Sequence, residues 1–438
     1  METNRKQDTI LKVFAKYAAL NILGMLGLSC YILADTLFIA NGVGSSGLTA
    51  LNLVLPVYSF ISGIGLMLGM GGGTRYSILR GERKEKEACR VFTMTLAAGI
   101  LAGLMITAAG LIFSSRLVVL LGADSGVEPL AGTYLKTILL FSCAFLLNNI
   151  LICFIRNDGN PKLSMIAMLA GSFSNVILDY IFIFPCRMGM FGAAFATGLA
   201  PVISMGILSV HWLTGKRNHG LSICKGIPVR YGRIIMIGLP SFITEFSSGV
   251  IMLMFNITIL KLAGNTGVAA YGIVANLALI VVAVYTGAAQ GMQPVISANY
   301  GSGNLVNVRQ TYRAAVFLSA ALGVLFVLAG TIFAGPLAGI FNKEQDRTLE
   351  LLAVQGIRYY FPAFLIMGVN IITAAYFAAS DRAVPSFWIS VLRGILAAAV
   401  FIIILPPALG MSGVWLVIPC AEAVTLAAGM LLYKRYHA

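Results

Sequence analysis

Long apolar segments dominate the chain, and short polar segments separate them. An α-helix rises 1.5 Å per residue, so about 20 apolar residues cross the roughly 30 Å hydrocarbon core of a bilayer. None of the segments shows the short alternating pattern of a transmembrane β-strand. The pattern predicts an all-α integral membrane protein with twelve transmembrane helices, at residues 14–40, 48–74, 91–113, 130–155, 162–185, 190–213, 234–261, 267–298, 314–341, 351–379, 384–407 and 411–433.

The twelve predicted spans form two sets of six, because the sequence repeats itself at an offset near 220 residues. GSSGLTA from Gly44 corresponds to GNTGVAA from Gly264, and GMFG from Gly189 corresponds to GMSG from Gly410. Six is an even number, so both halves enter the membrane from the same side. We therefore expect a pseudo-twofold axis along the membrane normal and a central cavity between two six-helix lobes. The predicted organisation is an N-lobe at 1–214, a cytoplasmic loop at 215–233 and a C-lobe at 234–438.

Composition and charge agree with a membrane protein and predict its orientation. The 438 residues are 59% hydrophobic and 11% charged, whereas soluble domains carry about 25% charged residues. The net charge of +14 does not indicate nucleic-acid binding, because the basic residues lie in the loops between apolar segments. With the spans alternating in direction, 22 Lys and Arg fall on one side and 7 on the other. The positive-inside rule then predicts a multi-pass protein of the bacterial inner membrane with both termini in the cytoplasm; we expect it to act as a monomer.

The cysteines give no sign of a disulfide framework or a metal centre. They are scattered, odd in number and without a CxxC pair. We expect them to act as small apolar packing side chains. They are Cys30, Cys89, Cys143, Cys153, Cys186, Cys224 and Cys420.

Four acidic residues lie inside predicted spans: Asp35, Asp179, Glu245 and Glu422. An ionised carboxyl group at the centre of a bilayer costs a few kcal/mol, roughly 3 on insertion scales. The neutral form is therefore favoured until a cation or an opening to water changes the balance. Such acids are typical of proteins that bind and release protons or small cations during transport.

The surroundings of Asp179 indicate a coupling site. Asn175 precedes Asp179 by one helical turn and lies on the same face of the helix, and Thr197 in the next span adds a hydroxyl. Together with Asp35 these residues offer oxygen ligands and one amide donor, which suit a proton relay or a hard cation such as Na⁺. The alternative is that each carboxyl hydrogen-bonds a helix end or a hydroxyl and only stabilises packing. We predict a site for H⁺ or Na⁺, with no other cofactor.

Several segments together resemble one transporter family. They include ADTLFIANGVGSSGLTALNLVLP from Ala34, the RNDGNPK loop, NVILDYIFIF, GAAFATG, and AAYGIVANLALIVVAVYTGAAQGMQPVISANYGSGN in the second half. These segments resemble the multidrug and toxic compound extrusion (MATE) family. The resemblance runs in order over essentially the whole chain. The resemblance implies a two-lobed antiporter that exports organic cations against H⁺ or Na⁺ by alternating access. It also implies an ion site formed by Asp35, Asn175, Asp179 and Thr197, and a cation-binding role for Glu245 and, more loosely, Glu422.

Polar and methionine side chains in the second half are candidates for binding the exported cation. Methionine repacks around different shapes, so a cavity lined by such residues would suit diverse lipophilic cations. Hydrogen bonds between helices and lipid-facing methionines are the alternative. The candidate substrate-binding residues are Glu245, Met252, Asn256, Asn276, Gln290, Gln293 and Glu422.

Three further features leave alternatives open. Arg393 lies inside a span, where it either reaches the membrane interface or neutralises a buried acid. Many relatives have a proline in the first span where this chain has Leu20, although the repeat-related Pro240 is kept. Gly24 and Gly27 offer another bending point, but close helix packing is the favoured role of these glycines.

Two other functions compete with export of cations. An intramembrane aspartyl protease would pair Asp35 with Asp179, but the GxGD motif of such enzymes is missing before Asp179, where the sequence is VIL. A flippase for lipid-linked saccharides would share the two-lobed fold, but its cavity would need Arg and Lys to hold pyrophosphate. The buried charges here are mostly acidic, so we predict a transporter of cations and not an enzyme.

Overall fold

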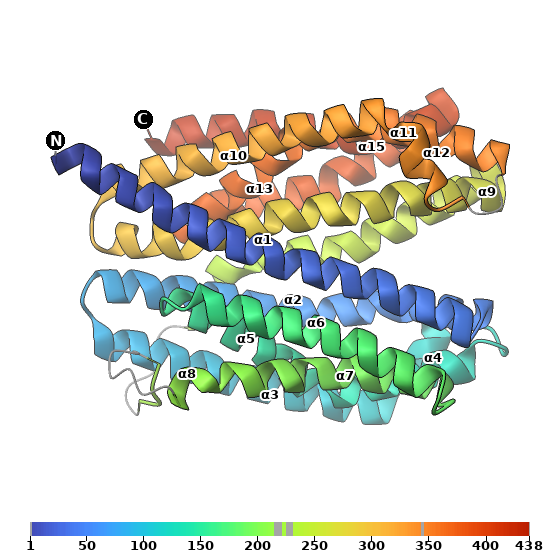
Figure 1. Cartoon of the computed structure of the whole chain (residues 1–438), viewed down its shortest axis with the longest axis horizontal. Helices are drawn as coiled ribbons and strands as arrows, with labels where there is room; N and C mark the ends of the chain where they lie inside the picture. Colours follow the sequence, from blue (N-terminus) through green and yellow to red (C-terminus); the bar gives the residue numbers. More distant parts are fainter. Residues whose placement is uncertain (1, 214–220, 225–230, 343–345, 438) are drawn as a thin grey trace. The chain divides into compact units, whose positions relative to one another are not determined.

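The computed structural model describes residues 2–213, 221–224, 231–342 and 346–437 (Figure 1). Every regular element in these ranges is helical. The first half contains α1 (Glu2–Gly42), α2 (Ser45–Gly81), α3 (Glu85–Leu120), α4 (Glu128–Leu140), α5 (Ser142–Asn157), α6 (Pro161–Ile183), α7 (Gly189–Leu208) and α8 (Val210–Leu213). The second half contains α9 (Tyr231–Gly301), α10 (Leu305–Ile332), α11 (Ala334–Gly339), α12 (Arg347–Tyr360), the 3-10 turn η1 (Phe361–Ala363), α13 (Phe364–Ala379), α14 (Ala383–Val391), the π-helical turn η2 (Leu392–Leu396) and α15 (Ala397–His437).

The described helices provide the twelve predicted membrane crossings. Nine helices are long and apolar enough to cross a bilayer, and α4 with α5 forms a tenth span that bends by 50°. α9 and the segment Ala383–Tyr436 have 71 and 54 residues, far more than one crossing needs. Each is interrupted by one glycine with non-helical backbone angles, Gly264 or Gly410. Each therefore contributes two spans, which brings the described total to twelve.

The internal repeat is visible in the backbone at the glycines that carried it in the sequence. Gly44 and Gly264 have φ values of 93° and 61°, and Gly189 and Gly410 have values of 56° and 59°. With ψ values of −170° at Gly44 and −156° at Gly264, these positive-φ conformations are ones that only glycine adopts readily, and they cost other residues about 1–3 kcal/mol. Corresponding glycines thus turn the chain between corresponding spans in both halves.

Contacts divide the chain into two compact units. We call Ala19–Phe246 with Ser297–Leu305 the N-terminal unit, and Met1–Ala18 with Ser247–Ile296 and Val306–Ala438 the C-terminal unit. Each unit is built mainly from one half of the repeat. The lobe bounds stay a prediction, because they follow the repeat and the polar loop rather than these contacts.

A run of glycines allows α2 to approach several helices of the N-terminal unit closely. A Cβ on Gly69 would lie 2.9 Å from the Asn149 carbonyl oxygen of α5, and one on Gly72 would lie 2.6 Å from the Thr95 hydroxyl of α3. Added side-chain atoms would therefore separate these helices. The glycines of α2 give close helix packing, as small residues do in membranes generally.

An aromatic stack lies in the core of the C-terminal unit. The ring of Phe255 stacks on Tyr271 with centroids 5.0 Å apart, and Tyr271 stacks on Trp415 at 6.5 Å. Phe255 and Trp415 are fully buried. The three rings join both parts of α9 to α15.

The first span is a continuous helix that includes Leu20. A Cβ on Gly24 would lie 3.1 Å from Met168, and one on Gly27 would lie 2.4 Å from Leu169. Both glycines therefore pack against α6, which agrees with the favoured packing role.

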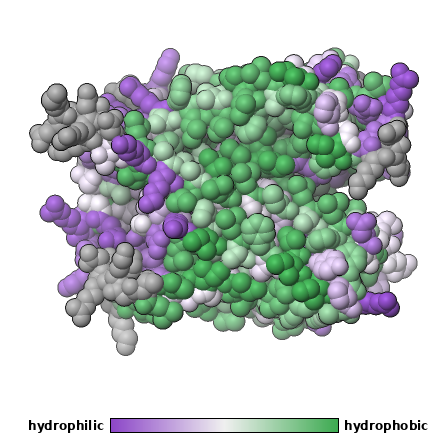
Figure 2. All heavy atoms as spheres, viewed as in Figure 1, coloured by the Kyte–Doolittle hydropathy of each residue, from purple (hydrophilic) through white to green (hydrophobic). Residues whose placement is uncertain are grey.

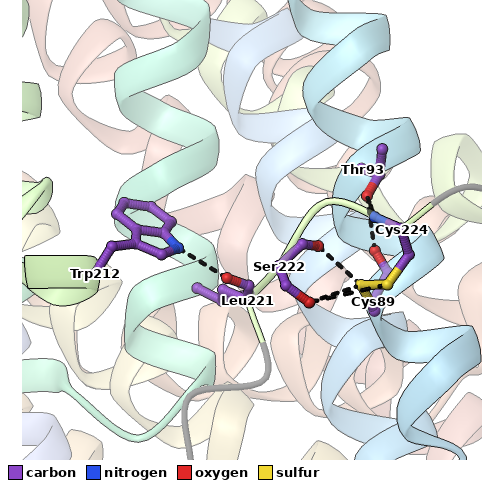
Figure 3. Close-up of a disulfide and its surroundings, with 6 residues drawn as sticks. All are labelled: Cys89, Thr93, Trp212, Leu221, Ser222 and Cys224. Carbon is purple, nitrogen blue, oxygen red and sulfur yellow. Dashed lines mark hydrogen bonds between the residues drawn. A yellow bond between two sulfur atoms is a disulfide. The ribbon is translucent and has the colours of Figure 1, made fainter. Parts of the chain in front are cut away.

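Two of the cysteines are bonded to each other, contrary to the sequence prediction. Cys89 of α3 and Cys224 form a disulfide across 135 residues of sequence (Figure 3). The prediction was wrong because spacing along the chain does not show which loop folds back onto which helix. The other five are free thiols.

The surface agrees with insertion into a membrane. On the face shown in Figure 2, hydrophobic residues cover the middle of the helices and hydrophilic residues gather near their ends. Many large apolar side chains are exposed, for example Leu101, Ile112 and Phe317, which are 60%, 71% and 76% exposed. Such exposure is stable in hydrocarbon and unfavourable in water.

Candidate functional site: a pair of buried carboxyl groups

Asp35 of α1 and Asp179 of α6, two residues of the predicted ion site, lie near each other inside the N-terminal unit. Asp35 is 7% exposed and Asp179 is fully buried. The two carboxyl groups lie close enough to interact electrostatically. Like charges at such close range repel each other, so the pair favours the uptake of positive charge.

Neither carboxyl group has a cationic partner among the described residues, and each keeps an unused oxygen. Asp35 Oδ1 and Asp179 Oδ1 are buried and accept no hydrogen bond there. A buried oxygen left without a donor costs roughly 1–3 kcal/mol. These two buried oxygens are therefore free to bind a proton or a small cation.

Asn175 and Thr197 complete the predicted set. With its amide oriented to match its neighbours, Asn175 donates to Asp179 Oδ2 at 3.0 Å and accepts from the Thr197 backbone N–H at 3.2 Å. The Thr197 hydroxyl donates to the Ala193 carbonyl within α7. Asn175 thus links α6 to α7 and fixes the orientation of the Asp179 carboxyl.

Tyrosines surround this pair, and sequence reasoning missed them. Tyr134 of α4 lies within hydrogen-bond reach of Thr197 and within electrostatic range of both aspartates. Tyr31 of α1 lies within electrostatic range of Asp35, and its hydroxyl is 3.2 Å from that of Tyr58 on α2. A tyrosine inside an apolar span is common, so nothing in the sequence set these three apart.

The buried acid of the C-terminal unit has a different environment. Arg393 Nε donates to Glu422 Oε1 at 2.8 Å, and Asn370 Nδ2 donates to Oε2 at 2.7 Å. Of the two roles considered for Arg393, the structure shows neutralisation of a buried acid. Arg393 lies in the π-helical turn η2, a type of turn that often occurs at functional sites.

The remaining predicted residues are divided between the two units. Glu245 belongs to the N-terminal unit, where it lies within electrostatic range of Tyr58. The other candidates belong to the C-terminal unit. In that unit Gln293 is buried and Met252 is 36% exposed, whereas Asn256, Asn276 and Gln290 are intermediate.

A second polar cluster surrounds Asp158, at the end of α5. Tyr76 donates to Asp158 Oδ1 at 2.5 Å, the guanidinium of Arg80 pairs with the same oxygen, and His211 Nε2 lies 2.9 Å from Oδ2. Burial raises the pKa of Asp158, but the hydrogen bonds from His211 and Tyr76 and the charge of Arg80 outweigh it and hold the pKa below its ordinary value. The cluster anchors α8 to α2 and α5. Arg156, two residues before Asp158, donates from Nη1 to Asn21 Oδ1 at 2.9 Å.

An apolar cavity of about 440 Å³ lies between α2, α3 and α4 with Phe246 of α9. Phe60, Phe113 and Ile106 are among its lining residues. Groups of three or more His, Cys, Asp or Glu that could hold a metal do not occur in the described parts of the chain.

The fold and this pair of acids define a class of protein: a polytopic membrane transporter of two six-helix lobes. The family model described as MatE matches residues 21–181 and 240–404, one match in each half. The chain belongs to the MatE family of transporters, and its function is transport rather than catalysis.

Curated relatives agree over nearly the full length. The multidrug export protein MepA of Staphylococcus aureus (strain MSSA476) is 26% identical over 431 residues, which cover 98% of this chain and 94% of the relative. MepA of Staphylococcus saprophyticus is 24% identical over 429 residues with the same coverage. Multidrug export by a multi-pass plasma-membrane protein is therefore the function that the family and relatives support.

Solved structures show the same fold. An outward-facing multidrug resistance MATE transporter of the MOP superfamily superimposes with a TM-score of 0.90 at 25% identity, over 98% of this chain and 96% of the other. A MOP superfamily transporter from Pyrococcus furiosus, described as having a binding pocket of reverse polarity, has a TM-score of 0.89 at 25% identity and the same coverage. Neither competing hypothesis, flippase or protease, is favoured by the family.

Proposed function

We propose that the protein is a secondary active antiporter that exports lipophilic organic cations in exchange for H⁺ or Na⁺. The observation that carries the proposal is the proximity of Asp35 and Asp179, two buried carboxyl groups that interact electrostatically and have no cationic partner among the described residues. Like charges so close cannot both ionise unless a positive ion enters. A cation and a proton therefore compete for this pair of carboxyl groups, because each removes the negative charge that attracts the other.

The cycle follows from that exclusion. A proton or Na⁺ bound at Asp35 and Asp179 neutralises the pair, and the N-terminal unit packs around a neutral site. Loss of the ion leaves a negative site that attracts the next cation. Coupling between ion and substrate is worth about 1–3 kcal/mol in typical cases, enough for a 5–150-fold change in affinity.

The substrate site is proposed at the remaining acids and polar groups. Glu245 supplies a carboxylate for the cationic substrate, and Met252, Asn256, Asn276, Gln290 and Gln293 supply adaptable apolar and polar contacts. Glu422 is the weaker candidate, because its charge is already balanced by Arg393. We also propose a monomer with both termini in the cytoplasm, on the distribution of Lys and Arg.

The proposal is tested by ethidium transport in everted membrane vesicles under an imposed gradient. One arm imposes a pH gradient, and the other imposes a Na⁺ gradient with the pH gradient collapsed, so that the arms identify the ion. Asp35→Asn and Asp179→Asn should each lower gradient-driven transport at least tenfold. Glu87→Gln, which changes an exposed acid at the start of α3, should not.

Folding of each variant is checked by the retention volume of the purified protein on a sizing column. Unchanged, gradient-dependent export by both aspartate variants would reject the ion site. Loss of export in the Glu87→Gln control as well would show that the assay reports general damage.

A further inference from the structure

A short described segment of the loop between the sixth and seventh spans is fixed to α3. The segment 221–224 ends at Cys224, whose sulfur is bonded to that of Cys89 in the second turn of α3 (Figure 3). The two Cα atoms are 5.9 Å apart, within the range that a disulfide requires. The family assignment and the proposed transport cycle make no use of this bond.

Non-covalent contacts hold the same segment in place. Trp212 Nε1 donates to the Leu221 carbonyl at 2.8 Å, and the Cys224 backbone N–H donates to the Thr93 hydroxyl at 3.0 Å (Figure 3). Leu221 is buried, and the Trp212 ring stacks on Phe92 of α3. These contacts flank the sulfur atoms on both sides, so they bring the two cysteines together without help from the covalent bond.

The environment of this bond makes it reversible. The Lys and Arg distribution places the loop and the start of α3 in the cytoplasm, where glutathione and thioredoxin keep thiols reduced. Disulfides that do form there are usually transient or redox-sensing. Cys89 is buried whereas Cys224 is partly exposed, so an external thiolate reaches the Cys224 sulfur first and expels Cys89 as the leaving thiolate.

We propose that Cys89 and Cys224 form a reversible thiol–disulfide modification site that fixes segment 221–224 to α3 in the transporter. In the oxidising direction, a low-molecular-weight disulfide RSSR reacts with one thiolate to give a mixed disulfide and one RSH. The second cysteine then displaces a second RSH. Two protein thiols are oxidised and one RSSR is reduced to two RSH, so atoms and electrons balance.

The bond adds a covalent link within one core cluster of the N-terminal unit. Leu221 beside the bond, Phe92 of α3 and Ile234 at the start of α9 are buried together in this cluster. Oxidation therefore holds the packing of α3 against the start of α9 more firmly than the non-covalent contacts do alone. This consequence rests on the proposed transport cycle and on the cytoplasmic position of the loop.

The bond itself is tested without any transport assay. Everted vesicles, which expose the cytoplasmic face, are treated with glutathione disulfide or with reduced glutathione, blocked with N-ethylmaleimide and digested with trypsin. Cleavage at Lys and Arg releases Cys89 in residues 87–90 and Cys224 in residues 218–225. We expect these two peptides to be linked after oxidation and separately alkylated after reduction. Absence of the linked peptide after oxidation, or its survival in reduced glutathione, would overturn the proposal.

The effect on transport is measured on the same vesicles. Oxidation should lower the ethidium transport rate of the parent several-fold, and reduction should restore it. Cys89→Ser with Cys224→Ser should be insensitive to both treatments, whereas Cys186→Ser, which removes an exposed free thiol, should respond like the parent. An oxidised parent with the linked peptide and an unchanged rate would refute the restraint. Failure of the proposed antiport would instead abolish gradient-driven transport in both redox states and leave the peptide result intact.

Discussion

Asp35 and Phe255 occupy corresponding positions of the two repeats, offset by 220 residues. The surroundings of Asp35 are acidic, whereas those of Phe255 are aromatic. Asp35 meets a second carboxyl group, Asp179, in the N-terminal unit. Phe255 stacks on Tyr271 in the C-terminal unit. One half of a duplicated fold thus carries a pair of buried carboxyl groups where the other half carries an apolar core.

Side-chain volume explains how the two halves differ at one place in the fold. By the same repeat, Tyr271 corresponds to Leu51 and Trp415 corresponds to Ala194. Large rings fill the C-terminal unit at these positions, whereas smaller side chains occupy the N-terminal unit. The repeat therefore preserves the backbone turns and leaves each half free to specialise in its interior.

The buried acids differ in the same way. Glu422 of the C-terminal unit is paired with Arg393, so the pair is neutral as a whole. Asp35 and Asp179 have no such partner among the described residues. Of these three acids in the described residues, Asp35 and Asp179 are therefore the two whose charge is not balanced by a cationic side chain.

The largest expected effect comes from giving the C-terminal unit the acid of the N-terminal unit. Phe255→Asp removes a buried ring, which costs about 3–5 kcal/mol, and adds a carboxyl group with no partner. We expect the free energy of unfolding in detergent micelles, measured by SDS titration, to fall by about 4 kcal/mol or more. Phe255→Leu is the control and should cost less than about 1.5 kcal/mol. Equal stability of the two variants would break the comparison.

The next largest effect is expected at Glu422, the buried acid of the C-terminal unit that is paired with a cationic side chain. Glu422→Gln leaves Arg393 buried without its carboxylate, which should cost about 3–5 kcal/mol of unfolding free energy. Combining it with Arg393→Gln should restore most of that loss, because no charge then remains. A double-mutant cycle measures the interaction. If the losses simply add, the pair does not stabilise the C-terminal unit.

A smaller effect concerns Asp158, the paired acid of the N-terminal unit. Its lowered pKa means that the folded state favours the charged form. It stabilises the protein above the carboxyl's unfolded pKa, about 3.9, and this contribution disappears as pH falls through the lower folded value. Asp158→Asn should therefore cost about 1.5–3 kcal/mol at pH 7. The difference from the parent should be constant between pH 7 and 5 and shrink below about pH 4. A difference that grows on acidification would contradict this assignment.

The smallest expected effect concerns the glycine turns, where the two halves share the same kind of backbone conformation. Gly44→Ala and Gly264→Ala place a Cβ in open space but at a positive φ. Each should cost about 1–3 kcal/mol, and the two costs should be similar. Gly206 of α7 also faces open space but has no positive φ, so Gly206→Ala should stabilise by about 0.5–1 kcal/mol. Clearly different costs at the two turns would show that the repeat is not equivalent there.

The amino-acid sequence determined the helical architecture of this protein. Hydrophobic segment length predicted all twelve spans, because a bilayer demands about 20 apolar residues per crossing and leaves the backbone no alternative to a helix. It also determined the turn positions, since Gly44 and Gly264 repeat with the spans that they connect. Asn175 and Asp179 could be placed together because one helical turn separates them.

Only the tertiary structure decided which distant groups meet. It brings Tyr134 to the aspartate pair, Arg393 to Glu422, and Cys224 to Cys89 across 135 residues. Contacts of this kind depend on how helices pack and rotate against each other, and hydrophobic periodicity does not specify a partner for a side chain on the far side of a neighbouring helix. Hydrophobicity along a chain is a local property, whereas a binding site is a set of atoms brought together by packing.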